Sequence, residues 1–562
     1  MSPGNDDATR YLCAASYLDP AYNTRVLKEF LVEPTRPIPP SPGVDASQVL
    51  TEAVRARARR KNYDGVLVLL TLLIIGIAWD QPLLYGWIVL SVLLSLTNLS
   101  GAGTPSLLQP VTFKAVVGVL IVVGLAVLVG FLISDGISSS SSSSYDDYYG
   151  SSSSSGDSST GRLVVAIVLA FVALIICLGE RWTLWQLLTT RFRRGTTPGP
   201  GGAGGLSGFL TEDFHAQLVR YQKASTPADV APLIVYRDFK PFVGSGTKRN
   251  AWSIAIPLEK LEEDELDELD ELDEDEERPK LTTDTLYAHI RSVLERLQQS
   301  GGLSPDLRLR DLTVTEEVFT PASELIDHLA QPEAVSYLPN LYAPPNTSLT
   351  RDEIDQIRLA PREWSRYYLC TRIETWDRDL VLSAYLHTAV DETTLYLEWT
   401  PFVLTPIRAG YRAVDKMRTD SYRPFWLGFM MWLRLPIGAL VRIGSLASWI
   451  RTPKRENGVI DPDRYGVASS LRELASGGYT DYFQQVDIER YEKIIDAQLL
   501  PSIGAFIEAA GYSAAKFEEQ TSTVINNEIS IGGNNTGAIT QVGQNRGLRR
   551  LRNAAGGSKG KP

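Results

Sequence analysis

Four apolar runs most constrain what this chain of 562 residues can fold into. They consist mainly of Leu, Val, Ile, Ala and Gly, and they occupy residues 63–79, 83–96, 113–133 and 163–178. A helix needs roughly 20 apolar residues to cross a hydrocarbon core about 30 Å thick, and the runs approach that length. The sequence therefore predicts an α-helical membrane bundle with four transmembrane helices within residues 63–180.

Lys and Arg near the ends of these runs predict the orientation of the helices. Five basic residues lie within 55–61, before the first run, and four lie within 181–194, after the fourth. The Ser-rich loop 134–161 has neither Lys nor Arg and carries four Asp residues. We therefore expect both termini in the cytosol, the loop outside as a disordered linker, and a location in the cell (plasma) membrane.

The remaining chain mixes strand and helix patterns. Runs of β-branched and aromatic residues, separated by turn residues, predict strands. The predicted strands are 232–239, 250–258, 366–376, 380–390 and 393–404, of which the last three form an antiparallel meander. Apolar residues recur at helical spacing within 284–299 and 486–510, which predicts two amphipathic helices. The mixture favours a cytosolic α+β domain with an antiparallel sheet.

Composition divides the chain outside the apolar runs into segments. The predicted segments are an N-terminal cytosolic helical segment 1–62, a juxtamembrane helix and Gly/Pro linker 181–208, the α+β domain 209–420 with an acidic insertion 259–280, a basic amphipathic segment 421–455, a C-terminal helical region 456–522, and a Gly/Asn-rich β-like motif with a basic tail 523–562.

The formal charge of −11 comes from one short segment. Residues 262–277 hold 13 acidic side chains, so removing these 13 negative charges from −11 leaves +2. Dense like charge repels itself and stays solvated, which favours a disordered acidic loop. Docking of a basic partner or of divalent cations on this loop is the alternative, and we expect no nucleic-acid partner.

A fifth apolar stretch, 424–450, differs from the four runs because it contains two arginines and because Pro436 interrupts it. An Arg deep in a bilayer costs about 3 kcal/mol on insertion scales. We therefore expect a bent amphipathic helix on the inner leaflet, attracted by anionic lipid headgroups. The candidate membrane-surface residues are Arg423, Arg434, Arg442, Arg451, Lys454 and Arg455. A pair of core helices and a fifth span are the alternatives.

The segment 242–249 is a candidate anion-binding turn formed by Gly244, Gly246, Lys248 and Arg249. It lacks the spacing of a phosphate loop, and it lies between two predicted strands, which favours an ordinary tight turn. Its amides, next to two cations, could still hold an anion. The chain shows no local catalytic, cofactor or metal-ligand pattern, because its three cysteines and four histidines are scattered.

Six stretches carry a resemblance that covers most of the chain: 11–20, 235–246, 252–255, 366–373, 380–383 and 411–415. They resemble segments of uncharacterised actinobacterial multi-pass membrane proteins. The resemblance implies a membrane location and a shared cytosolic domain. It implies no activity and no catalytic residues.

The C-terminus carries a near-palindromic Asn/Gln/Gly pattern. Residues 523–531 alternate like a strand, and the residues Asn535, Gly537, Gln541, Gly543 and Asn545 follow. The pattern is similar to bacterial amyloid-signalling motifs, which implies pairing with like motifs on partner proteins. Asn and Gln ladders suit stacked strands of this kind. A simple β-hairpin or a flexible tail is the alternative.

Three functional hypotheses follow. The first is a non-enzymatic membrane anchor for a cytosolic domain that binds a ligand, lipid or protein partner. The second is a self-assembling signalling component that acts through the C-terminal motif. The third is a membrane-bound enzyme of unknown class, for which the sequence shows no catalytic constellation.

Overall fold

The computed structural model describes residues 7–96 apart from 34, 38 and 40, and residues 156–195, 231–261, 278–299, 309, 312–447 and 460–522. Several features of the sequence lie outside these residues: the run 113–133, most of the loop 134–161, the acidic run 262–277, Arg451, Lys454 and Arg455, and the C-terminal motif from Asn535 to Asn545. The chain divides into two compact units. The first is Met1–Ala251, Leu294–His387 and Trp399–Ile495, and the second is Trp252–Val293, Thr388–Glu398 and Asp496–Pro562.

In the first unit, the N-terminal helices pack into a core of their own. They are α1 (Asp7–Leu18), α2 (Pro20–Phe30) and α3 (Ala46–Ile77). The side chain of Asp19 caps α2 by accepting the backbone N–H groups of Ala21 and Tyr22. The core contains Leu12, Tyr22 and Leu50, together with Trp185 of α6 (Gly156–Arg191) and Phe192, which follows the last residue of α6.

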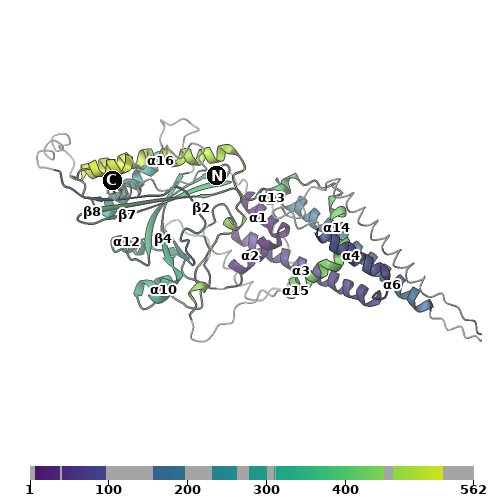
Figure 1. Cartoon of the computed structure of the whole chain (residues 1–562). Coiled ribbons are helices and arrows are strands. Elements are labelled where there is room, and N and C mark those ends of the chain that lie inside the picture. Colours follow the sequence, from purple (N-terminus) through teal and green to yellow (C-terminus); the bar gives the residue numbers. More distant parts are fainter. Residues whose placement is uncertain are drawn as a thin grey trace, which may run out of the picture. The chain divides into compact units, whose positions relative to one another are not determined.

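The apolar runs form helices, but they do not form four spans. Figure 1 shows α3 and α6 running side by side. Helix α14 (Arg423–Leu433) packs on α6, α15 (Leu435–Ala447) packs on α3, and α4 (Pro82–Leu96) packs on both α14 and α15. Among the described residues, Gly161–Arg191 is the one helix long and apolar enough to cross a membrane. The pair α14 and α15, bent by 88°, adds a second candidate only if it counts as one span. This finding overturns the prediction of four transmembrane helices.

Length and charge explain the correction. The helix α4 has 15 residues, about 22 Å at 1.5 Å per residue, which is short of a 30 Å hydrocarbon core. The apolar end of α3 is the second half of a 32-residue helix, which begins well before the first run and also contains Arg60, Lys61 and Asp64. The third run lies outside the described residues.

The α+β region is built on a mixed sheet. The described strands are β1 (Ala231–Tyr236), β2 (Thr247–Lys248), β3 (Trp252–Pro257), β4 (Leu312–Pro321), β5 (Ser348–Leu349), β6 (Arg366–Thr375), β7 (Leu380–Val390) and β8 (Thr394–Leu404). Their order is β2-β8-β7-β6-β4-β1-β5, and β3 pairs with β8. Strands β6 and β7 are antiparallel, with Cys370 opposite Tyr385. The predicted antiparallel sheet is wrong in one respect, because β1 runs parallel to β4, with Leu233 opposite Val318.

The chain between β1 and β4 explains the parallel pair. Parallel neighbours need a crossover of a dozen or more residues, and this connection contains α9 (Thr283–Gln299). The meander β6, β7 and β8 has short turns and agrees with its prediction. In the first unit, α12 (Arg351–Leu359) packs on the sheet, and Arg358 pairs with Glu316 of β4. The remaining helices of the sheet region include α10 (Ala322–Asp327), α11 (Pro332–Tyr337) and α16 (Tyr482–Ala509).

Candidate functional site: an apolar helical layer with charged ends

The helices around α6 expose large apolar side chains instead of burying them. On α6, Phe171 is 60% exposed, and on α15 Val441 is 75% exposed. The exposed large apolar side chains of these helices are Val66, Leu69, Leu72, Leu73, Leu83, Tyr85, Val89, Val92, Leu93, Val164, Val165, Ile167, Val168, Phe171, Val172, Ile175, Phe425, Leu440, Val441 and Ile443. Monomeric soluble proteins rarely expose contiguous apolar patches above a few hundred Å². We call the helices α3 from Gly65, α4, α6 from Leu163 to Gly179, α14 and α15 the apolar layer.

An ion pair lies at each end of the apolar layer. Arg162 of α6 pairs with Asp80 at 3.3 Å, and Arg442 of α15 pairs with Asp64 of α3 at 2.5 Å. We call these ends the Asp80 rim and the Asp64 rim. Between the rims, α6 runs through 17 residues without a charge, which correspond to about 26 Å. The layer is therefore close in thickness to a hydrocarbon core of about 30 Å.

The pair α14 and α15 enters the apolar layer at the Asp64 rim and returns to it. Phe425 stacks on Trp182, with ring centroids 4.9 Å apart, on the side of Glu180 away from the layer. Further along α14, the indole Nε1 of Trp432 donates to the carbonyl of Ala170, about midway along the charge-free part of α6. After the bend, Arg442 reaches Asp64. Both ends of the pair therefore lie at the same rim.

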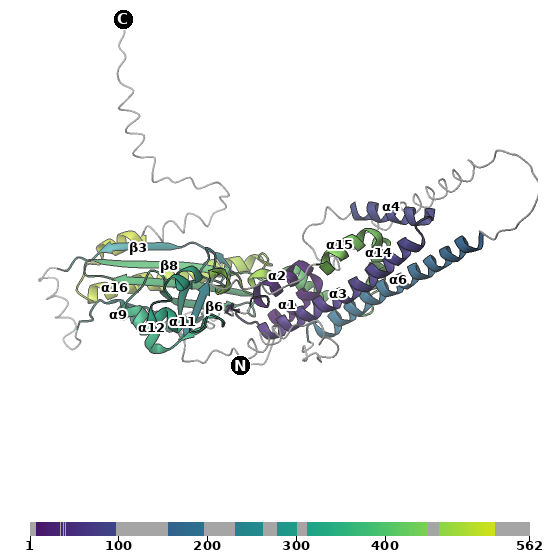
Figure 2. The same cartoon turned by 90° about the horizontal axis from the view of Figure 1, so that it is seen from below.

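A neighbouring helix satisfies one of the backbone amides that this bend exposes. Pro436 in the first turn of α15 has no backbone N–H, and the helix breaks beside it. The next amide, that of Ile437, donates to Ser91 Oγ of α4 at 3.1 Å. A helix break at membrane depth requires such replacement bonds, because hydrocarbon offers none. We expected this segment on the surface of the inner leaflet; the structure instead packs it against α3, α4 and α6, as Figure 2 shows.

Gly428 sets how closely α14 approaches α6. A Cβ atom at this position would come within 2.8 Å of Leu178 Cα and 2.9 Å of the Cys177 carbonyl oxygen. Real Cβ atoms do not come this close to another backbone, so a side chain at 428 would push the two helices apart. Small residues at helix contacts allow this kind of close packing in apolar surroundings.

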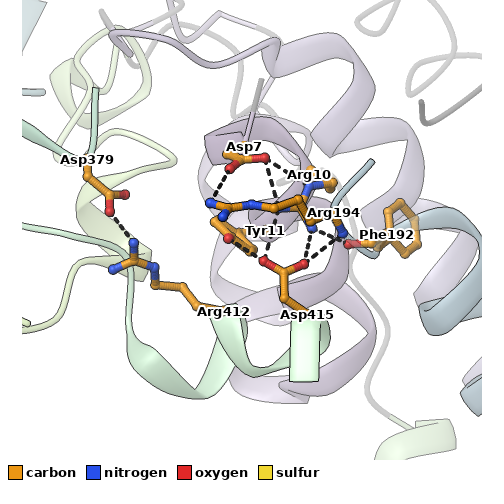
Figure 3. A network of polar contacts seen from close by, with 8 residues as sticks. All are labelled: Asp7, Arg10, Tyr11, Phe192, Arg194, Asp379, Arg412 and Asp415. Atoms are coloured by element: carbon orange, nitrogen blue, oxygen red, sulfur yellow. Dashed lines mark hydrogen bonds and ion pairs between the residues drawn. The ribbon is translucent and has the colours of Figure 1, made fainter. Parts of the chain in front are cut away.

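A buried arginine ties the end of α6 to the N-terminal helices. Arg10 of α1 is 3% exposed, and its Nη1 donates to the carbonyl of Phe192 at 2.5 Å, just past the last residue of α6. The last carbonyls of a helix have no partner within the helix, so Arg10 satisfies one of them. Figure 3 shows the guanidinium between Asp7 and Asp415, at 2.8 and 2.6 Å.

Asp415 is the centre of this contact network. It also accepts the hydroxyl of Tyr11 at 2.6 Å and the backbone N–H of Arg194 at 2.8 Å. Burial alone would raise the pKa of Asp415, but the hydrogen bonds from Arg10 and Tyr11 outweigh burial and lower it. Nearby, Arg412 pairs with Asp379, which precedes β7. The network therefore links α6, α1 and the sheet.

In the structure, the predicted anion-binding turn binds the carboxylates of two Glu side chains from elsewhere in the chain. The amide of Gly246 donates to Glu473 at 2.9 Å, and Arg249 makes two bonds of 3.0 Å to Glu492. Gly244 has a φ of 98° and Gly246 a φ of 91°, which glycine tolerates best. Lys248 is exposed.

The segment around this turn crosses one face of the sheet. The ring of Phe242 contacts four aromatic rings, one from each of four strands: Phe319 of β4, Tyr368 of β6, Tyr385 of β7 and Phe402 of β8. Beneath it, Arg372 pairs with the buried Glu317 at 3.0 Å. The segment thus closes a polar cluster inside the domain.

The described residues hold no group of three or more metal-binding side chains. The three cysteines are free and buried, and burial raises the pKa of the Cys370 thiol, which disfavours the reactive thiolate. His289 bonds to Ser502 within the second unit. Sequence reasoning missed Arg10, Asp415 and the Asp64–Arg442 pair, since these partners lie 405 and 378 residues apart.

Comparison with known proteins assigns the sheet-bearing part of the chain. A family model, the AbeC-like domain, matches residues 251–540, which is more than half of the chain. The chain belongs to the AbeC-like family. Comparison with curated proteins and with solved structures gives no match.

The AbeC-like domain includes α14 and α15 as well as most of the sheet. These two helices pack on α3, α4 and α6, which precede the matched region. The region matched by the family model therefore contributes two helices, α14 and α15, to the apolar layer. The actinobacterial and membrane parts of the resemblance stay predictions.

Proposed function

We propose that the chain is a membrane-anchored, non-enzymatic module that holds its AbeC-like domain at the cytosolic face of the cell membrane. The domain would bind a ligand, lipid or protein partner there. The observation that supports this function is the exposed apolar surface of α6, which lies between two charged rims at nearly the thickness of a bilayer core. The basic residues beside the Asp64 rim favour placing that rim toward the cytosol.

The energy of this exposed surface supports a membrane rather than water as its surroundings. Seven large apolar side chains of α6 between Val164 and Ile175 are exposed. Full burial of such a side chain is worth about 1.5–3 kcal/mol. Because these side chains are about half exposed, α6 alone would gain roughly 7 kcal/mol in hydrocarbon. That gain is comparable to the whole stability of a typical domain.

Flotation of membranes followed by alkaline extraction tests this proposal. We expect the full chain to float with membranes and to stay with them at alkaline pH, which removes peripheral proteins. Flotation matters because aggregated protein sediments instead of floating. A wild-type chain that remains at the bottom of the gradient, or that alkaline pH releases, would overturn the proposal.

Two variants test whether α6 anchors the chain in the membrane. The triple variant Val168→Asp, Phe171→Asp, Ile175→Asp places charges on exposed apolar positions of α6, and we expect it to lose membrane retention. The matched control is Tyr482→Asp, Phe483→Asp, which changes exposed aromatic residues of α16. We expect the control to float like wild type.

A further inference from the structure

The two rims of the apolar layer differ in charge. The Asp80 rim has one acid and one base, Asp80 and Arg162. The Asp64 rim, on α3, α6 and α15, has two acids, Asp64 and Glu180, against six bases. These bases are Arg57, Arg59, Arg60, Lys61, Arg181 and Arg442. One rim is therefore close to neutral, and the other has a clear excess of positive charge.

Two arginines of the Asp64 rim, Arg60 and Arg181, form no salt bridge among the described residues. Arg442 is bound to Asp64, and Arg59 donates to the Glu180 carbonyl and the Thr183 hydroxyl. Arg60 makes no hydrogen bond within the described part of the chain, and the Nε of Arg181 contacts the Met431 sulfur at 3.2 Å, a weak acceptor. Both side chains are half-buried. The charges of Asp64 and Glu180 attract the charge of Arg60, and those of Arg181 and Arg57 repel it.

The surplus of bases over acids at this rim favours a further anion there. Arginine presents its N–H donors in a planar fork that matches a phosphate group. The exposed apolar side chains of α3 and α6 continue directly from this rim toward the Asp80 rim. An anion with an apolar tail therefore fits the site better than a small free anion.

We propose that Arg60 and Arg181 bind the phosphate of an anionic phospholipid in the cytosolic leaflet. This inference rests on the proposed function, since it needs the apolar layer inside a bilayer. It also places the headgroup contact on α3 and α6, whereas the sequence analysis expected it on the stretch 424–450. Arg442, predicted to face the lipid, is paired with Asp64, whereas Arg60 on α3 and Arg181 on α6 form no salt bridge among the described residues.

Native mass spectrometry of the full chain, released from nanodiscs, tests the proposal by counting retained lipids. The nanodiscs contain equal amounts of phosphatidylglycerol and phosphatidylcholine. We expect wild type to retain phosphatidylglycerol preferentially. Each basic residue near an anionic surface is worth roughly a fivefold change in binding, so Arg60→Gln, Arg181→Gln should lower the preference by roughly 25-fold. The control Arg162→Gln, which removes one positive charge from the Asp80 rim, should keep the preference for phosphatidylglycerol.

Three outcomes would overturn the inference: equal retention of both lipids by wild type, an equal loss in the control, or displacement of the lipid by millimolar inorganic phosphate. The last would identify a free phosphate site. The Arg60→Lys variant separates charge from folding, because it keeps the charge and should retain most of the preference. A chain that does not enter nanodiscs at all would instead contradict the proposed function.

Discussion

The apolar layer and the mixed sheet use the same apolar residue types with opposite exposure. On β7, the side chains of Leu382 and Leu386 are completely buried, whereas on α6 those of Ile167 and Phe171 are mostly exposed. Burial of the β7 side chains removes apolar area from water, which stabilises the sheet. The exposed α6 side chains lack this stabilisation unless hydrocarbon surrounds them. This difference in exposure is the basis for our proposal that the two regions fold in different solvents.

Both regions also contain a buried ion pair, but they support it differently. In the sheet, Arg372 pairs with Glu317, and Ser383 and Tyr385 also contact the guanidinium. In the apolar layer, Arg442 pairs with Asp64 at a rim. A rim position leaves access to water or headgroups, so the cost of an unpaired charge should be larger in the sheet.

The largest expected effect is the loss of the sheet's ion pair. Arg372→Met leaves Glu317, which is 2% exposed, as an unpaired buried charge. Removal of one partner of a buried pair costs about 3–5 kcal/mol. We expect a loss of this size in the free energy of unfolding, measured by denaturant titration in detergent. The double variant Glu317→Leu, Arg372→Met should recover most of it, and a double variant as unstable as the single would contradict this account.

The contact between α14 and α6 gives the next effect. We expect Gly428→Ala to lower the free energy of unfolding by about 1–3 kcal/mol, because its Cβ has no room beside Leu178. Gly444→Ala on α15 is the matched control, since a Cβ atom at position 444 would meet no other atom within 4 Å. Equal stability of the two variants, measured by thermal unfolding in the same detergent, would contradict the close packing of α14.

A smaller effect concerns pH at the Arg10 network. Because the pKa of Asp415 is lower in the folded protein, its ionised form stabilises the fold above about pH 4, the ordinary Asp value. That contribution is lost as pH falls through the folded pKa. Asp415→Asn should therefore flatten the fall in stability below pH 4, measured by urea unfolding across pH 2–6. Parallel curves for wild type and variant would contradict the role of Asp415.

Local patterns predicted the elements better than their partners. The strands expected at 366–376, 380–390 and 393–404 agree with β6, β7 and β8 within one residue, because alternation and turn residues are local signals. The parallel pairing of β1 with β4 has no such signal, because partners such as Leu233 and Val318 are far apart in the chain.

The apolar runs show the limit of composition as a guide. The sequence indicates four helices of spanning type. Helix length and neighbouring charges leave one candidate span, or two if the bent pair counts, among the residues that the structure describes. From composition alone, we expected Arg442, in the stretch 424–450, to face lipid headgroups. Its partner Asp64, 378 residues away, is visible only in the folded chain.

Cysteine labelling at the two ends of α6 tests the central claim most directly. Gly161→Cys and Thr190→Cys place exposed thiols beyond the two rims, and the native Cys13, Cys177 and Cys370 are buried. In intact cells, an impermeant thiol reagent should label Gly161→Cys and spare Thr190→Cys, while both should react after lysis. Equal labelling of the two positions in intact cells, or protection of both, would show that α6 does not cross the membrane.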